Sequence, residues 1–172
     1  MNIQTDTPHY YEIEPELLKK FFLRHLDRIY CAKSHLVERL QESNISARFE
    51  DLNLAVNKTC KNVTSQIARM NRIYMLLGAK ASMQHCDGLV AMVEDAFSSI
   101  HQQEDSELLR NLSILAYLHE IESVEIASFN MLLLAAAHLP NKEVVRLIKE
   151  NLDEANADRN LIMLITKKYL KA

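Results

Sequence analysis

Four carboxylic acids and one histidine in the second half of the chain have spacings that suit a metal site. His119, Glu122 and Glu125 follow one another at steps of three residues, and Glu154 precedes Asp158 by four. Residues three or four apart lie on the same side of a helix. Carboxylate oxygens suit Mn²⁺ or Mg²⁺, and a histidine nitrogen adds a preference for Fe²⁺ or Zn²⁺. These five residues are therefore the candidate metal ligands.

The other reactive residues predict no covalent catalysis. No Ser/His/Asp or Cys/His arrangement falls at helical spacing, and the three cysteines, an odd count, include no CxxC pair. We expect reduced thiols, as is usual in the cytoplasm, which is the location we predict. Cys31 and Cys60 are expected to be buried free thiols that pack as small apolar side chains, and packing is also the expected role of Cys86.

Composition excludes several fold and partner classes. The 172 residues include only two glycines, Gly78 and Gly88, and three prolines. Hairpins and phosphate-binding loops depend on glycine, so β folds, Rossmann domains and P-loops are excluded. The net charge is −3, and the sequence has no basic run, signal peptide or apolar stretch of membrane-spanning length. We expect neither nucleic acid nor a membrane as partner.

An all-helical chain must therefore position the candidate ligands. We expect a tail over residues 1–14 and a single domain over 15–172. Breaks in the periodic pattern divide this domain into helices over 15–42, 47–77, 86–101, 105–138 and 142–170. Ser46 is the expected N-cap of the second helix, and Gly78 is expected to end it. Because segment 79–104 can cross from one end of a bundle to the other, the pattern predicts a ferritin-like four-helix bundle with a short crossover helix.

Polar residues interrupt the apolar seam of each long helix near its middle. We write each seam with alternating steps of three and four residues; the seam of the helix over 105–138 then starts at Leu108. The polar residues in the four seams are, in chain order, Lys33; Thr59 and Gln66; His119 and Glu122; Asn151, Glu154 and Asp158. Side-by-side packing would bring them to one height, with Asn62 and Glu125 beside them. Buried carboxylates need a positive partner, so this layer is where metal ions would bind. The alternative is a drifting seam that leaves Glu125 or Asp158 on a solvated face.

Several segments, taken together, resemble a known family. They are Ile29–Lys33, Gln66–Arg69, Glu94–Ala96 with Cys86 before it, Glu122–Phe129 and Leu147–Glu154. In this order, over about residues 17–165, the chain resembles the YciF/YciE-type ferritin-like proteins, which are bacterial stress-associated helical bundles of largely unknown function. The resemblance implies the ferritin-like fold and a metal site in its interior.

The resemblance also implies that half of this metal site has changed. Lys33 stands where the family's first helix has a metal-binding glutamate, in the pattern Tyr-x-Ala-Glu. The second helix of the family has His-x-x-Glu-x-x-x-Gln, of which Thr59 and Asn62 replace the first two members and Gln66 remains.

The third and fourth helices match the family better. Glu122 and Glu125 are retained, with His119 at a position that is usually Gln. Glu154 and Asp158 match only after a one-residue shift; without it the matching positions are 155 and 159, an alanine and an arginine.

Three interpretations follow from these substitutions. A protonated ammonium group does not bind a metal and repels one nearby. We expect Lys33 to pair with Glu122 or a neighbouring carboxylate, while Asn62 and Gln66 supply hydrogen bonds, in a protein that has no cofactor and is not an enzyme. One alternative is a single divalent ion (Fe, Mn or Zn) on the four acids, with or without His119. The other is a working dinuclear iron or manganese centre in a stress-response or iron-handling protein.

The expected partner is a second copy of the chain. We predict a homodimer formed through helix faces. The apolar run Leu132–Ala137 predicts either a segment buried on all sides or such an interface.

Overall fold

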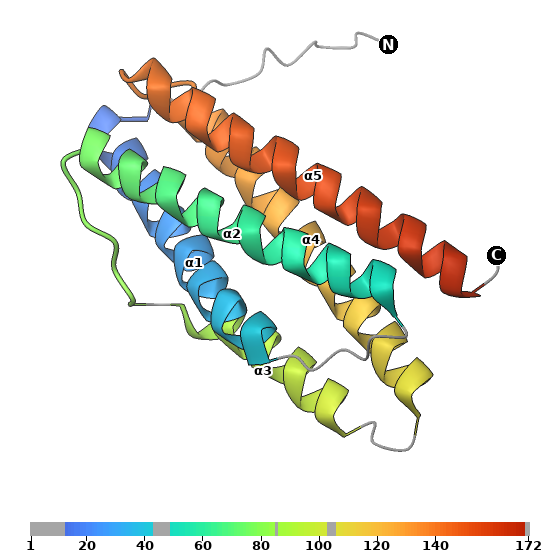
Figure 1. The fold of residues 1–172 in the computed structure, drawn as a ribbon. Helices are drawn as coiled ribbons and strands as arrows, with labels where there is room; N and C mark the ends of the chain where they lie inside the picture. Colours follow the sequence, from blue (N-terminus) through green and yellow to red (C-terminus); the bar gives the residue numbers. More distant parts are fainter. Residues whose placement is uncertain (1–12, 43–48, 85, 103–105, 171–172) are drawn as a thin grey trace, which may run out of the picture.

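Five helices form the described part of the computed structural model, which covers residues 13–42, 49–84, 86–102 and 106–170. They are α1 (Pro15–Glu42), α2 (Glu50–Leu76), α3 (Asp87–His101), α4 (Glu107–Ala136) and α5 (Lys142–Leu170) (Figure 1). Within these ranges there is no strand, so the predicted all-helical class is confirmed. None of the described helices is both long enough and apolar enough to cross a bilayer.

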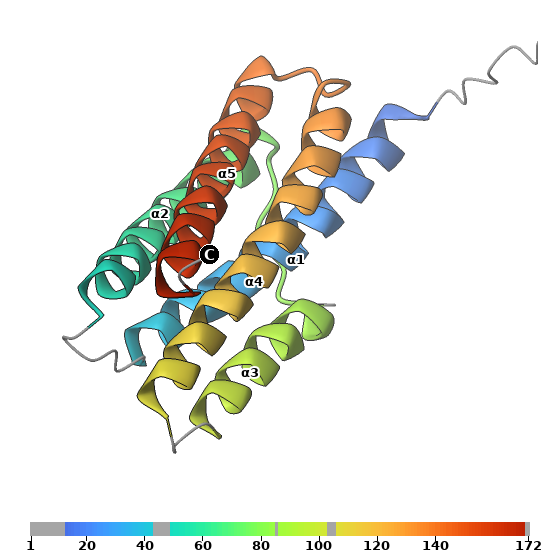
Figure 2. The ribbon, with the colours of Figure 1, turned by 90° about the vertical axis from the view of Figure 1, so that its right-hand side faces the viewer.

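The four long helices form the predicted bundle. α1 packs on α2 and α4, and α5 packs on the same two helices. α2 runs antiparallel to α1, and α4 then runs in the same direction as α2 (Figure 1). The chain must therefore return along the bundle between α2 and α4, and it does so through a connection and the short helix α3 (Figure 2). This single long crossover is the ferritin-like topology.

Local signals explain the start of α1 and the end of α2. α1 begins at Pro15, where the missing N–H of a first-turn proline costs nothing. α2 stops before Gly78, which has a φ of 61°. The N–H of Ala79 donates to the Tyr74 carbonyl at 2.8 Å, a closing pattern that needs the left-handed residue between. Gly78 thus ends the helix as predicted.

Some predicted bounds differ from the structure. α2 begins at Glu50 rather than at residue 47, and the proposed cap Ser46 lies outside the described residues. α4 ends at Ala136, two residues early, and starts after Ser106, whose Oγ accepts the Leu109 N–H at 3.3 Å.

The predicted seam of α4 is wrong at its start. Leu108 is 47% exposed, whereas Asn111 is buried. A strict seven-residue repeat drifts by about 20° per heptad on a straight helix, so a seam centred on Glu122 is displaced at the end of so long a helix.

Two apolar clusters fill the bundle, one toward each end. Phe22, Met70, Phe129 and Ile148 belong to the first. The second includes Leu36, Leu52, Leu115 and Ile162, together with Phe97 of α3. Most of the buried polar side chains lie where the sequence passes from one cluster to the other: Lys33 on α1, Gln66 on α2, Glu122 and Glu125 on α4, and Asp158 on α5.

The expectation of three reduced cysteines is wrong for two of them. Cys31 on α1 and Cys86, just before α3, form a disulfide with their Cα atoms 6.0 Å apart, while Cys60 is free and half-buried. Periodicity within α1 and α2 carries no information about the path of the crossover. The returning connection lies against α1 and brings together two residues that are 55 positions apart.

Candidate functional site

A layer of polar side chains lies in the middle of the bundle, and we call it the polar layer. Its members are Lys33 from α1, Thr59, Asn62 and Gln66 from α2, Glu122 and Glu125 from α4, and Asn151 and Asp158 from α5. All except the half-buried Asn62 are at most 3% exposed. Each lies on the inward face of its helix, because the apolar residues around it in the seam are themselves buried.

The ammonium group of Lys33 pairs with Oε2 of Glu125, and both side chains are buried. Lys33 Nζ also lies 5.5 Å from the centre of the Phe129 ring, whose face attracts a cation. An unpaired charge in this position would be very costly. Glu125, the neighbour of Glu122 on α4, is thus the counter-ion of Lys33.

Glu122 is buried beside this ion pair. Burial raises its pKa well above the ordinary value, and the negative charge of Glu125 raises it further, whereas Lys33 acts in the opposite direction. Asp158 adds a smaller repulsion. These surroundings therefore favour the protonated form of Glu122 more strongly than water does, and a hydrogen bond between its carboxyl group and that of Glu125 acts in the same direction.

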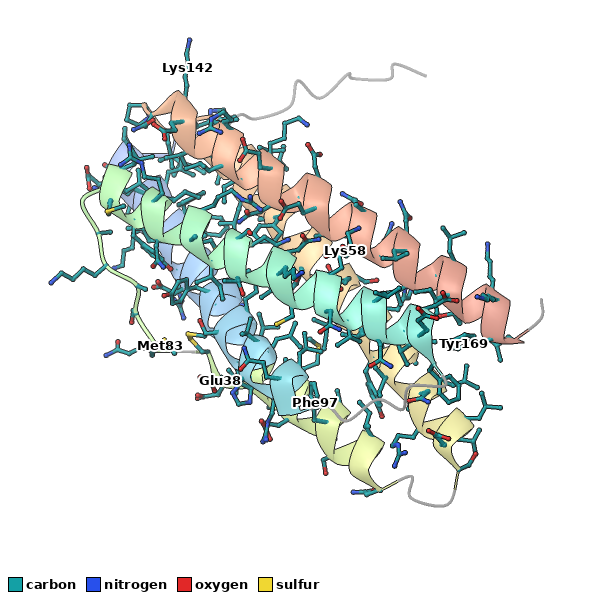
Figure 3. The ribbon with its side chains drawn as sticks, viewed as in Figure 1. Glu38, Lys58, Met83, Phe97, Lys142 and Tyr169 are labelled. Carbon is teal, nitrogen blue, oxygen red and sulfur yellow. A yellow bond between two sulfur atoms is a disulfide. The ribbon has the colours of Figure 1, made fainter. Side chains whose placement is uncertain are left out.

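Asp158 is neutralised from the α2 side. Nδ2 of Asn62 lies 2.9 Å from each of its carboxylate oxygens. Lys58, whose side chain is half exposed, places Nζ 3.6 Å from Oδ1, and Figure 3 labels this lysine beside α2 and α5. A long side chain thus brings a surface cation to a buried carboxylate.

Glu154 does not join the other acids. The Arg69 guanidinium binds it, and Nε of the same arginine donates to Oδ1 of Asn151 at 2.6 Å. Glu154 is only half-buried. Arg69 therefore holds one of the five candidate ligands outside the group formed by Glu122, Glu125 and Asp158.

His119 is also separate from the carboxylates in its bonding. It is half-buried, and its Nδ1 is a buried atom with no hydrogen-bond partner among the described residues.

Sequence reasoning missed the roles of Lys58 and Arg69. Positions 58, 62, 66 and 69 follow one another on α2 at steps of four, four and three, so the two cations share a face with Asn62 and Gln66. That spacing was the available signal.

The residues present do not fit a dinuclear metal centre. In the described ranges, no three or more His, Cys, Asp or Glu side chains are grouped so as to hold a metal ion. Such a centre needs several carboxylates free to bridge two cations. Here Glu125 is bound to Lys33, Asp158 to Asn62, and Glu154 to Arg69.

Some hydrogen-bonding capacity in the polar layer is unused. Three buried side-chain atoms of this layer have no hydrogen-bond partner among the described residues: Oε1 of Gln66, Oε2 of Glu122 and Nδ2 of Asn151. Two of the three are oxygens, which could accept a hydrogen bond or bind a cation.

Comparison with known proteins identifies the family. A family model described as "Domain of unknown function (DUF892)" matches residues 17–171. Protein YciF of Escherichia coli (strain K12) is 25% identical over 141 residues, which are 81% of this chain and 84% of that protein.

Two solved structures share the fold. The E. coli stress protein YciF has a TM-score of 0.79 at 20% identity, over 90% of this chain and 97% of the other. YcfI from Rhodopseudomonas palustris has a TM-score of 0.76 at 21% identity, over 90% and 98% of the two chains. The resemblance predicted from the sequence is confirmed, and the chain belongs to the DUF892 family of YciF-like proteins.

Proposed function

We propose that this protein is a non-enzymatic ferritin-like bundle whose polar layer is a converted metal site. The observation that carries the proposal is the fully buried ion pair of Lys33 with Glu125. The ammonium group supplies positive charge among the carboxylates, which is the electrostatic task of a metal ion in a related bundle.

Charge balance supports this interpretation. The polar layer has three carboxyl groups, on Glu122, Glu125 and Asp158. The positive charge of Lys33 balances Glu125. Asp158 is stabilised by Lys58 and Asn62. The raised pKa of Glu122 favours its protonated, uncharged form. The charges of the layer are thus balanced by protein side chains, with Lys58 reaching in from the surface of α2, and no metal-dependent step is assigned to the layer.

A single divalent ion is the second candidate. The unpartnered oxygens Glu122 Oε2 and Gln66 Oε1 favour it, since a cation could bind both. It requires Lys33 to leave Glu125 and extend along the helix.

Metal analysis of the full chain distinguishes these candidates. The protein is treated with a chelator, and separate portions are dialysed against Fe²⁺ (without oxygen), Mn²⁺ or Zn²⁺. The metal content of each portion is measured, and oxygen consumption is followed after oxygen is added to the Fe²⁺ portion. We expect less than about 0.1 metal ion per chain and no iron-dependent oxygen consumption, since true sites bind stoichiometrically. One ion per chain favours the second candidate, and two ions contradict the proposal.

Restoring the acids tests the conversion directly. The double variant Lys33→Glu with Asn62→Glu is expected to gain stoichiometric iron or manganese binding. Lys61→Glu with Asn57→Glu is the matched control, because it makes the same charge change at exposed positions of α2. A folded test variant that binds no more metal than the control would contradict the conversion.

We also infer a homodimer, in the cytoplasm and without a nucleic-acid or membrane partner. Exposed apolar side chains at one end of α1 and α4 support the dimer: Leu17, Phe21, Met131 and Leu134, at 57%, 40%, 49% and 67% exposure. The negative net charge argues against nucleic acid. YciF is described as a stress protein, and we propose a stress-related role here as well.

Light scattering after gel filtration tests the dimer. The variant Phe21→Glu with Leu134→Glu is expected to be monomeric at concentrations where the parent is dimeric. Leu54→Glu, at a 62% exposed position of α2, is the control and should leave the mass unchanged. A monomeric parent would refute the dimer.

A further inference from the structure

The crossover is attached to α1 by a row of residues at steps of four, which we call the crossover stripe. Its members are Asp27, Cys31, His35 and Arg39. Residues four apart on a helix are neighbours, so the stripe turns slowly along one side of α1. Every member contacts the crossover connection or α3.

The stripe makes three successive attachments. Oδ1 of Asp27 accepts the Ser82 N–H at 3.0 Å. Cys31 forms the disulfide with Cys86. Farther along, His35 and Arg39 both bind the Glu94 carboxylate on α3, with Arg39 Nε donating at 2.6 Å. The disulfide is the covalent member of this series, and it lies where the connection becomes α3.

We propose that the Cys31–Cys86 disulfide is a reversible thiol–disulfide exchange site that takes a dithiol as its reductant. Its reduction would release the end of the connection, after Ser82, and the first turn of α3 from α1. The middle of α3 would stay in place, so the bundle would remain folded.

The exchange reaction balances in two steps. A thiolate of the dithiol attacks Sγ of Cys31, the sulfur beside Met83, and forms a mixed disulfide with it, while Cys86 leaves as a thiolate that takes up a proton. The second thiol of the reductant then attacks the reductant sulfur of the mixed disulfide, which closes the reductant's own disulfide and releases Cys31 as a thiolate that takes up a proton. Two electrons and two protons pass to the protein, and the dithiol becomes a disulfide.

The surroundings of the sulfurs accommodate both redox forms. Sγ of Cys31 lies 3.6 Å from the carbonyl oxygen of Ser82, and Sγ of Cys86 lies 3.6 Å from that of Gln84. These oxygens can accept hydrogen bonds from the S–H groups that reduction creates, so each thiol would have a hydrogen-bond partner. The reduced pair thus meets no unsatisfied polar environment.

Access to the disulfide depends on the side chain of Met83, which lies beside it. Cys31 and Cys86 are 1% and 4% exposed, so the reductant cannot reach them in the closed form. Sδ of Met83 lies 3.5 Å from Sγ of Cys31, and Met83 is itself 65% exposed (Figure 3). Methionine is unbranched and flexible. Displacing it, on a non-helical segment, opens a path without breaking a helix.

Other contacts limit the extent of release. After reduction, Glu94 would still bind His35 and Arg39, and Val93 and Phe97 would remain in the apolar cluster. Asp27 would also still accept the Ser82 N–H, so opening should be confined to about residues 83–84 and 86–92.

Hydrogen–deuterium exchange of the full chain, oxidised and then treated with excess dithiothreitol, tests the proposal. We expect amides within residues 83–84 and 86–92 to exchange on the order of tenfold faster after reduction, with α5 unchanged. Removing the reductant under air should restore protection. Cys31→Ser with Cys86→Ser should match the reduced form, and Cys60→Ser should behave like the parent.

Alkylation and mass spectrometry give the state of each thiol in the same samples. One reactive thiol before reduction and three afterwards are expected. Three thiols in the air-oxidised protein, a native disulfide that resists excess dithiothreitol, or equal exchange in both states would each overturn the proposal. Faster exchange throughout the bundle would also overturn it, because the disulfide would then be a staple of the whole fold.

Discussion

Two glutamates near α1 have pKa values that are shifted in opposite directions: Glu122 in the polar layer and Glu94 beside the crossover stripe. Glu122 is buried, and desolvation is the largest cause of its raised pKa. Glu94 has a side chain that is 40% exposed, and hydrogen bonds, first from Arg39 and then from His35, lower its pKa to about 2. The same side chain is thus driven toward the acid in one place and toward the carboxylate in the other.

The difference teaches how the two regions tolerate change. In the polar layer each charge has few partners and little contact with solvent. Removing one partner therefore leaves a buried charge uncompensated, which is strongly destabilising. Along the crossover stripe, water can replace a lost partner, so attachments can be broken singly. Changes in the polar layer should therefore have larger effects on stability than changes in the stripe.

The largest effect is expected for Lys33→Met. The substitution keeps most of the side-chain volume but leaves Glu125 buried without its counter-ion, so the free energy of unfolding should fall by about 3–5 kcal/mol. Urea denaturation measures it. The double variant with Glu125→Met should recover most of the loss, since both charges are then gone. A single variant as stable as the parent would show that the ion pair is not buried.

The next effect is expected for Asn62→Leu. Asp158 would lose the amide that lies 2.9 Å from both carboxylate oxygens, so the free energy of unfolding should fall by about 1–3 kcal/mol. Asn57→Leu, at an exposed position of α2, is the control and should change stability by less than about 0.5 kcal/mol. Equal losses in the two variants would contradict a role for the amide.

A pH-dependent effect is expected for Glu122→Gln. Because folding raises the pKa of Glu122 above 4.5, its contribution to stability is complete below that value and is lost as pH rises through the folded-state pKa. The parent should therefore lose stability toward alkaline pH, and the variant should lose less. Urea midpoints across the pH range measure this, with Glu120→Gln as an exposed control on α4. Parallel profiles for parent and variant would contradict the raised pKa.

The smallest effect is expected for Glu94→Gln, with the opposite sign. Folding lowers the pKa of Glu94 from 4.5 to about 2, so its contribution is present above 4.5 and is lost as pH falls through about 2. The variant should show a shallower loss of stability in acid than the parent. Asp95→Asn, exposed on the same helix, is the control. An acid profile unchanged by Glu94→Gln would break the contrast between the two glutamates.

Local sequence signals predicted most of the fold. The α1 and α5 bounds follow from Pro15 and from the break around Pro140, and Gly78 ends α2. The seam pattern also identified most of the residues of the polar layer, because an inward position on a long helix depends mainly on its own periodicity. The same method failed at Leu108, where drift over a long helix displaced the seam.

The amino-acid sequence by itself determined five helices, a crossover long enough to reverse direction, and polar residues at the centre of the bundle. Only the tertiary structure decided which groups meet. Lys33 binds Glu125, Glu154 is held by Arg69, and Cys86 reaches Cys31. The physical reason is that such pairs depend on the rotation and axial offset of whole helices and on the path of the crossover. Periodicity within one helix carries no information about either.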